Sequence, residues 1–121
     1  YHNHDFEFET LEGQVPYNLL LTQTKAKMEL DLYWAVKSGN DPVALFKKHP
    51  GRFEMWHVKD MDKTEKKFFT VVGNGVIDFR PIFAAAKTAG LKYYYVEQDQ
   101  TPGNPLDSIT TSYKNLTKIL A

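Results

Sequence analysis

The chain has no cysteine among its 121 residues, which excludes a disulfide framework and a thiolate metal site. Any metal must therefore be bound by His, Asp or Glu. Fifteen acidic side chains balance fifteen basic ones, so the formal net charge is zero. Binding to nucleic acid or to anionic membranes depends on a surplus of Lys and Arg, and no apolar run reaches spanning length. We therefore expect neither nucleic acid nor membrane as a partner, and the lack of cysteine is typical of a cytoplasmic protein.

The chain also lacks an initiator Met, a signal peptide and any linker or low-complexity segment. It begins at Tyr1 inside an apparent β-strand, which we interpret as a cut end of a longer protein. A hydrophobic content of 42% excludes a disordered tail and is sufficient for one modest core. We therefore expect residues 1–121 to form a single domain.

Four strand-then-helix units follow one another along the chain. The expected strands are YHNHDFEF (1–8), KMELDLYW (27–34), RFEMWHVKD (52–60) and KYYYVEQD (92–99). The helix starts have clear signals, because Asp41 and Asn104 are good N-caps and each precedes a proline suited to the first helical turn. Gly90 is typical of the residue after a helix end. The series predicts parallel strands joined by right-handed helical crossovers.

Four parallel strands with charged residues on their inner face do not form a comfortable free-standing sheet. A (β/α)₈ barrel takes about 250 residues, roughly twice the length of this chain. The predicted fold class is therefore α/β, with four βα units forming the C-terminal half of a TIM barrel.

Each expected strand offers one nitrogen or oxygen donor near its carboxyl end, where TIM barrels carry their active sites. By alternation, these donors are His2 or His4, Asp31, His57 and Glu97. Glu97 follows an apolar strand, and a buried carboxylate needs a partner or a metal. Such a set of donors without sulfur suits one divalent ion, Mn²⁺, Mg²⁺, Co²⁺ or Zn²⁺, in an open catalytic site.

Five segments in this order resemble the xylose isomerase-like TIM barrels, the sugar phosphate isomerase/epimerase group. The segments are YHNHDFEF, ELDLYWAVKSGNDPVALFKKHPGR, WHVKDMD, GNGVIDF and YYYVEQD, and together they span nearly the whole chain. The resemblance implies a metal site in the C-terminal half of the barrel. Carried over by position, Asp31, His57 and Glu97 match family ligands, whereas His2 stands where many members have a Glu. Trp34 also departs from the epimerase branch, which has a His there.

The implied function is a metal-dependent sugar or sugar phosphate isomerase or epimerase that acts through an enediolate on a small sugar or polyol. The candidate catalytic residues are Glu97, Lys59 and His4, with Trp34 and Lys59 as candidate substrate-binding residues. Trp34 could stack on a sugar ring, and Lys59 could orient a hydroxyl or stabilise oxyanion charge. The long segment 61–77 is typical of a lid or binding loop.

Three alternatives remain open from the sequence. Loss of a β-hydroxyl instead of proton return would make the enzyme a lyase, and the HNH variant is similar to the inosose dehydratase branch. A non-catalytic carbohydrate-binding barrel is the second. A nuclease of the same superfold is the third, and the neutral charge counts against it.

An isolated half-barrel would leave unpaired strand edges and an exposed inner face with Phe53, Met55, Tyr93 and Tyr95. Edges of this kind pair with another chain or aggregate. We therefore expect self-association if the half-barrel is made alone.

Overall fold

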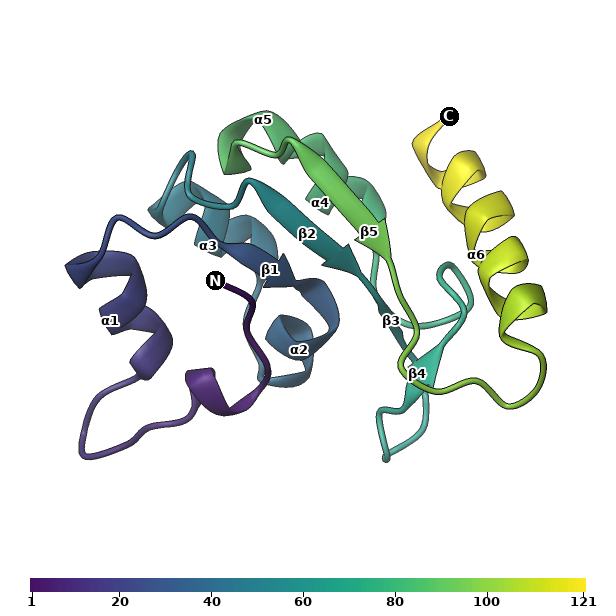
Figure 1. Ribbon diagram of the computed structural model, residues 1–121, viewed down its shortest axis with the longest axis horizontal. Helices are drawn as coiled ribbons and strands as arrows, with labels where there is room; N and C mark the ends of the chain where they lie inside the picture. The colour runs from purple at the N-terminus through teal and green to yellow at the C-terminus, as the bar shows by residue number, and fades with distance from the viewer.

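The computed structural model describes residues 1–121 as a mixed α/β structure around a three-stranded parallel sheet (Figure 1). The sheet has the order β1 (Glu29–Asp31), β2 (Met55–Val58), β5 (Tyr93–Val96). Asp31 lies in register with His57, which in turn lies in register with Tyr95. The carboxyl ends of the three strands therefore meet at one edge.

The helices lie between and after these strands, as expected for parallel crossovers. They are α1 (Pro16–Gln23), α2 (Leu32–Lys37), α3 (Pro42–Lys48), α4 (Phe79–Ala84), α5 (Ala86–Ala89) and α6 (Pro105–Leu120). In Figure 1, α3 and α4 lie behind the sheet and α6 stands beside β5. No helix combines the length and the apolarity needed to cross a lipid bilayer.

The helix boundaries predicted from local signals are confirmed. The Asp41 carboxylate accepts a hydrogen bond from the Val43 N–H, and the Asn104 side chain accepts one from the Leu106 N–H. The prolines that follow both caps occupy the first helical turn. Gly90 ends α5 with φ 80°, the left-handed conformation that favours glycine.

The expected first strand, residues 1–8, is wrong as a continuous strand. Only an isolated parallel bridge joins His2 to Glu29, and Phe6–Phe8 form a 3₁₀ turn. The physical reason is a set of side-chain hydrogen bonds that bend the segment: the Glu7 carboxylate accepts from the Tyr1 hydroxyl and from the His4 N–H. The parallel sheet thus has three strands and one bridging segment where four strands were expected.

The second expected strand is shorter than the sequence suggested. It ends at Asp31, whose carboxylate caps α2 by accepting from the Trp34 N–H at 3.1 Å. Tyr33 and Trp34 are therefore helical, and the alternation expected for them does not apply.

The core fills the space between the sheet and the helices that cover it. Trp56 stacks on Phe46 with ring centroids 4.9 Å apart, and Leu30 and Val58 are buried beside them. Phe53 also belongs to this core, since it is fully buried and its ring packs against Phe46. Its expected place on an exposed inner face is wrong, because β2 begins only at Met55 and the alternation does not extend back to Phe53.

The segment from Met61 to Ile77 contains a two-stranded antiparallel ribbon at its start. In this ribbon β3 (Asp60–Met61) pairs with β4 (Phe69–Thr70). The buried Asp60 carboxylate accepts backbone N–H groups from Met61, Gly73, Gly75 and Ile77. Burial raises the pKa of the Asp60 carboxyl above its usual value, although the four N–H groups oppose this shift. From α6, Ser112 and Asn115 bond to the backbone of Val72. The loop is therefore fastened on two sides.

The outer edge of the sheet is open. Tyr93 and Tyr95 on β5 are about half or more exposed, at 64% and 49%. A groove of about 410 Å³ runs between β5 and α6 and is lined by Tyr94, Val96, Ile109, Tyr113, Leu116, Thr117 and Leu120. These surfaces are of the kind that invites pairing, and self-association of an isolated half-barrel stays a prediction.

Candidate metal centre

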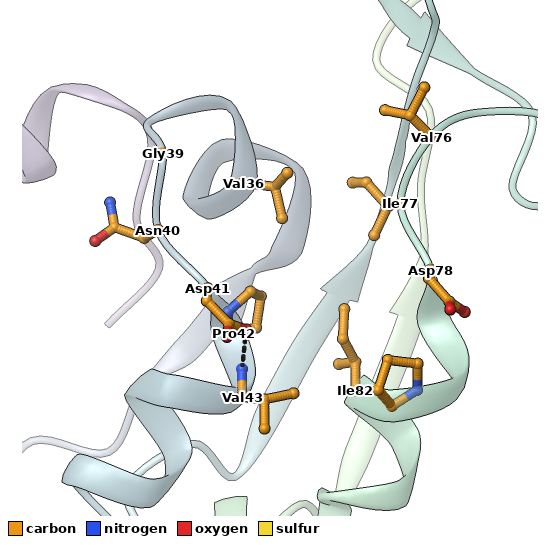
Figure 2. A pocket seen from close by; sticks show the side chains of 11 residues that line it. Val36, Gly39, Asn40, Asp41, Pro42, Val43, Val76, Ile77, Asp78 and Ile82 are labelled. Carbon is orange, nitrogen blue, oxygen red and sulfur yellow. Dashed lines mark hydrogen bonds between the residues drawn. The ribbon is translucent and has the colours of Figure 1, made fainter.

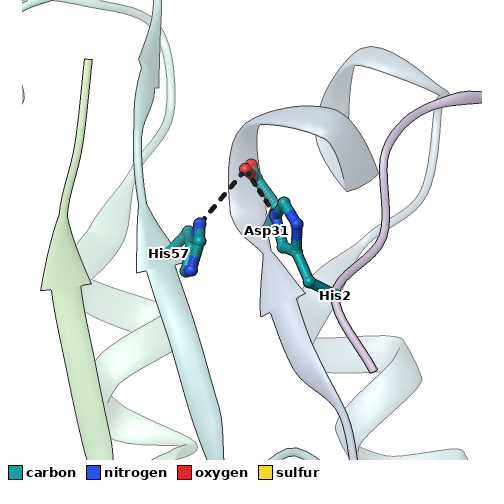
Figure 3. Close-up of side chains that lie close together, drawn as sticks. All are labelled: His2, Asp31 and His57. Atoms are coloured by element: carbon teal, nitrogen blue, oxygen red, sulfur yellow. Dashed lines mark hydrogen bonds and ion pairs between the residues drawn. The ribbon is translucent and has the colours of Figure 1, made fainter. Parts of the chain in front are cut away.

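Three residues from separate parts of the chain converge at the carboxyl edge of the sheet. His2, Asp31 and His57 each offer one donor atom, and these atoms all lie within 4.8 Å of one another (Figure 3). His2 comes from the bridging segment, Asp31 ends β1, and His57 lies on β2. The structure thus brings together three of the four residues expected to bind a metal, and the fourth, Glu97, lies next to His57.

Asp31 is the central carboxylate of this group and is fully buried. One oxygen, Oδ1, caps α2, which leaves Oδ2 to face the other members. Oδ2 lies 3.3 Å from Nε2 of His2 and 3.0 Å from Nζ of Lys59. Because the cap fixes the side chain, Oδ2 is held in place at the strand end.

His57 is contacted by a carboxylate on each ring nitrogen. Its Nε2 lies 2.7 Å from Oε1 of Glu29, in hydrogen-bond geometry. Its Nδ1 lies 2.6 Å from Oε2 of Glu97 and 3.8 Å from Oδ2 of Asp31. The buried Nδ1 nevertheless has no correctly oriented hydrogen-bond partner. Its contact with Glu97 is therefore a close approach of two possible metal-ligand atoms and not a hydrogen bond.

Lys59 extends the group toward β5. Its side chain is 3% exposed, and its Nζ lies 2.7 Å from Asp99 and 3.5 Å from Glu97. Burial lowers the pKa of Lys59, but the hydrogen bond to Asp99 and the charge of Asp31 outweigh it and raise the pKa above its usual value. Lys59 is therefore an ammonium at neutral pH.

The N-terminal segment is held in place by hydrogen bonds from residues next to its histidines. The buried Asn3 side chain accepts a hydrogen bond from the Asp31 N–H at 2.9 Å. The backbone carbonyl of Tyr1 accepts another from the Glu29 N–H. The Glu7 hydrogen bond raises the pKa of the Tyr1 hydroxyl to about 12. These contacts fasten the segment alongside β1, and thereby place His2 against Asp31.

Aromatic side chains form a rim around the centre. His4 is exposed and lies outside the group of converging donors, with its ring 5.0 Å from that of His2 and 5.5 Å from that of Phe6. Trp34, in the first turn of α2, is half-buried, and its ring lies 5.8 Å from His4 and 5.9 Å from Phe69. The expected catalytic His4 and substrate-binding Trp34 thus stand at the rim.

The residues fit a divalent cation. Four carboxylates, those of Glu29, Asp31, Glu97 and Asp99, face one ammonium and two imidazoles. Such a surplus of negative charge in a partly buried place needs a compensating cation. The nitrogen and oxygen donors are those that Mn²⁺, Co²⁺ and Zn²⁺ accept, and the buried Nδ1 of His57 has no hydrogen-bond partner in the protein.

A separate surface groove of about 410 Å³ lies between the start of α3 and the start of α4 and shares no residue with this centre (Figure 2). Its two carboxylates are used locally: Asp41 caps α3, as drawn in Figure 2, and Asp78 caps α4 by accepting from the Arg80 N–H. The remaining lining is mainly aliphatic. The groove therefore offers no free carboxylate for a metal.

Three residues of the centre were not assigned a role from the sequence. Asn3 is one of them, and its position between His2 and His4 was the only feature of the sequence that indicated a role. Glu29 and Asp99 were visible on the same faces as Asp31 and Glu97, but their partners, His57 and Lys59, come from other strands. Sequence separation hid these contacts.

Curated proteins with related sequences show what this chain is similar to. The chain is 30% identical to inosose dehydratase of Lacticaseibacillus casei over 119 aligned positions, which cover 80% of this chain and 40% of the relative. It is 26% identical to the rhizopine catabolism protein MocC of Rhizobium meliloti, with 100% of this chain and 43% of the relative covered. No protein-family model matches the chain. The chain spans about 40% of the length of the curated relatives it matches.

Solved structures agree. A sugar phosphate isomerase/epimerase from Parabacteroides distasonis ATCC 8503 superposes with a TM-score of 0.77 at 31% identity, covering 96% of this chain and 43% of that one. A second structure of that description superposes with a TM-score of 0.70. This share of the neighbours' length fits the half-barrel interpretation. Sequence and structure together show that the chain belongs to the xylose isomerase-like TIM barrel family.

Proposed function

We propose that the protein takes part in a divalent-metal-dependent isomerisation or epimerisation of a sugar or polyol, by removal of a proton next to a carbonyl. The observation that carries this proposal is the convergence of His2, Asp31 and His57 within 4.8 Å, with Glu97 and Lys59 beside them. The relatives are named for reactions on carbohydrates and inososes, which supports the same class of substrate.

His2, Asp31, His57 and Glu97 would hold the cation. When bound, a divalent cation supplies Lewis-acid polarisation of adjacent hydroxyl and carbonyl oxygens. The capped Asp31 and the strand-borne His57 provide rigid ligands, because their backbone positions are fixed by the sheet register. Glu97 lies just after β5 and its side chain is 40% exposed, so it faces the open mouth.

Glu97 is the proposed general base. It would take the proton from the hydroxyl-bearing carbon next to the carbonyl. The electron pair of that C–H bond would then move toward the carbonyl oxygen to give an enediolate. The Lys59 ammonium, 3.5 Å from Glu97, would stabilise the developing negative charge on oxygen.

The product depends on where a proton returns. Return to the neighbouring carbon, with transfer of the hydroxyl proton to the former carbonyl oxygen, moves the carbonyl and gives an isomer. Return to the first carbon from its opposite face gives an epimer. His2, 28% exposed and 3.3 Å from Asp31, stands where many family members have a Glu, so proton return from the opposite face would fall to an imidazole, to Lys59 or to water. Trp34 and His4 would border the substrate at the rim.

A lyase is the second candidate, and the names of the relatives favour it. Several relatives of 30% identity or more are inosose dehydratases. The first step would be the same proton removal by Glu97. Hydroxide would then leave the β-carbon, assisted by a proton from His2 or water, so that the reaction releases one water and forms a carbon–carbon double bond.

Deuterium exchange tests the shared first step. The protein is incubated in D₂O with Mn²⁺ and a panel of ketoses and keto-inositols, and proton NMR records loss of the C–H signal. We expect Mn²⁺-dependent exchange with at least one substrate, together with an isomer, an epimer or an elimination product. Product identity then separates isomerase from lyase.

A Glu97→Gln variant is the matched control, because it keeps the shape of the side chain and removes the base. Exchange in the wild type that persists in Glu97→Gln would contradict the assigned base. No exchange with any member of the panel, despite Mn²⁺ binding, would favour a carbohydrate-binding barrel without turnover.

A further inference from the structure

Glu29 is a carboxylate in an unusual place. It is the first residue of β1, two residues before Asp31 and on the same face of the sheet, and it lies in register with Met55 of β2. Interiors of TIM barrels are filled mainly by branched apolar side chains below the active-site layer. Its side chain is 25% exposed, so a carboxylate here loses part of its hydration. This position calls for a specific partner.

That partner is His57. Oε1 of Glu29 lies 2.7 Å from Nε2 of the imidazole, in hydrogen-bond geometry. An ionised carboxylate only accepts hydrogen bonds, so the ring nitrogen must donate. The proton of a neutral His57 therefore sits on Nε2, and Nδ1 carries the lone pair.

The other nitrogen, Nδ1, lies close to carboxylate oxygens of the centre. Nδ1 is buried, has no hydrogen-bond partner, and lies 2.6 Å from Glu97 Oε2 and 3.8 Å from Asp31 Oδ2. When His57 is neutral, its Nδ1 and Oε2 of Glu97 are two electron-rich atoms 2.6 Å apart, and a cation in contact with both would relieve their repulsion. Glu29 thus determines which nitrogen of a neutral His57 is available to a metal.

We propose that Glu29 is a positioning residue, which holds His57 in the tautomer and orientation needed to ligate a divalent cation through Nδ1. This inference rests on the proposed metal-dependent function. Carboxylates that accept from the second nitrogen of a metal-bound His fix the tautomer and make the ligand more basic. Glu29 itself lies one layer below the ligands and does not contact substrate.

The experiment measures Mn²⁺ affinity in the whole protein, by the electron paramagnetic resonance signal of free Mn²⁺. Glu29→Ala removes the acceptor and should weaken binding about 10- to 100-fold, the range found for such partners. Glu29→Gln keeps an acceptor oxygen and should weaken binding less than Glu29→Ala. Glu54→Gln is the matched control, because Glu54 pairs with Lys27 and Lys92 away from the centre, and it should bind Mn²⁺ like the wild type.

A second readout needs no metal and no activity. In ¹⁵N-labelled protein, the ring nitrogens of His57 report the tautomer directly. We expect Nε2 to be the protonated nitrogen in the wild type and in Glu29→Gln, and a mixture of tautomers in Glu29→Ala. Circular dichroism checks that each variant is folded, and Glu29→Gln alone decides the matter by its affinity if Glu29→Ala does not fold.

The outcomes are distinguishable. A wild-type protein that does not bind Mn²⁺ would overturn the proposed metal centre, and this inference with it. A wild-type protein that binds Mn²⁺, with unchanged affinity in both Glu29 variants and an unchanged His57 tautomer, would overturn the role of Glu29 alone.

Discussion

Strand β2 has two faces with different purposes. Trp56 and Val58 are fully buried, and Trp56 stacks on Phe46. On the alternate positions lie His57 of β2 and Lys59, which directly follows the strand. They contact carboxylates from β1 and from the residues after β5. The apolar face gains stability from burial, whereas the charged face pairs ionisable groups whose attraction is offset by their loss of hydration.

The difference indicates that the apolar face supplies the stability of this fold and that the charged face supplies its candidate metal ligands. The carboxylates at the strand ends are tolerated because the apolar layer beneath the helices supplies the free energy of folding. The two faces should therefore respond differently to substitution, in stability on one side and in metal binding on the other.

The largest expected effect on stability is at Trp56. Truncation by Trp56→Ala should destabilise the protein by about 3–5 kcal/mol, because it opens a cavity next to Phe46 and Phe83. Trp56→Phe is the milder control, since it keeps an aromatic ring and removes an indole N–H that has no partner. Urea unfolding followed by circular dichroism measures both.

The opposite face supplies the contrast. His57→Ala should change the free energy of unfolding by no more than about 1 kcal/mol, as for partly exposed ion pairs, while abolishing tight Mn²⁺ binding. A loss of stability in His57→Ala as large as in Trp56→Ala would break the separation of the two faces.

A smaller effect on stability is expected in the loop 61–77, which leads from the sheet to α4. The Cβ of Gly75→Ala would clash with the Asp60 carboxylate and with the Met61 carbonyl, so we expect a loss of about 1–3 kcal/mol. Gly103→Ala is the matched control, because no atom lies within 4 Å of the position that its methyl group would take and its φ is not in the left-handed region. Equal melting temperatures for the two variants would show that Asp60 does not fasten the loop.

Local signals predicted local structure well. Asp41, Asn104 and Gly90 define helix ends through bonds to residues close in sequence, and all three predictions hold. Alternation also identified the charged edge of the sheet, because Asp31, His57 and Glu97 lie at or next to the carboxyl ends of β1, β2 and β5.

Contacts between distant residues could not be predicted. Residues 1–8 looked like a strand, but Glu7 and Asn3 bend and fasten the segment through bonds to Tyr1, His4 and Asp31. The cap from Asp31 to Trp34 was a readable signal, yet the apolar residues after Asp31 fit a strand equally well. Lys59 and Asp99, and His57 and Glu29, meet only when the sheet register is known.

The most direct test of the account is the binding of Mn²⁺ by the wild type and by a double variant, Asp31→Asn with Glu97→Gln. Asn still caps α2, so the fold should persist while two ligands are lost. Asp41→Asn, a helix cap outside the centre, serves as the control. We predict one Mn²⁺ per chain by calorimetry and a rise in melting temperature with Mn²⁺ in the wild type and in Asp41→Asn, and neither in the double variant. Unchanged binding and an unchanged melting shift in the double variant would contradict a metal centre at the strand ends.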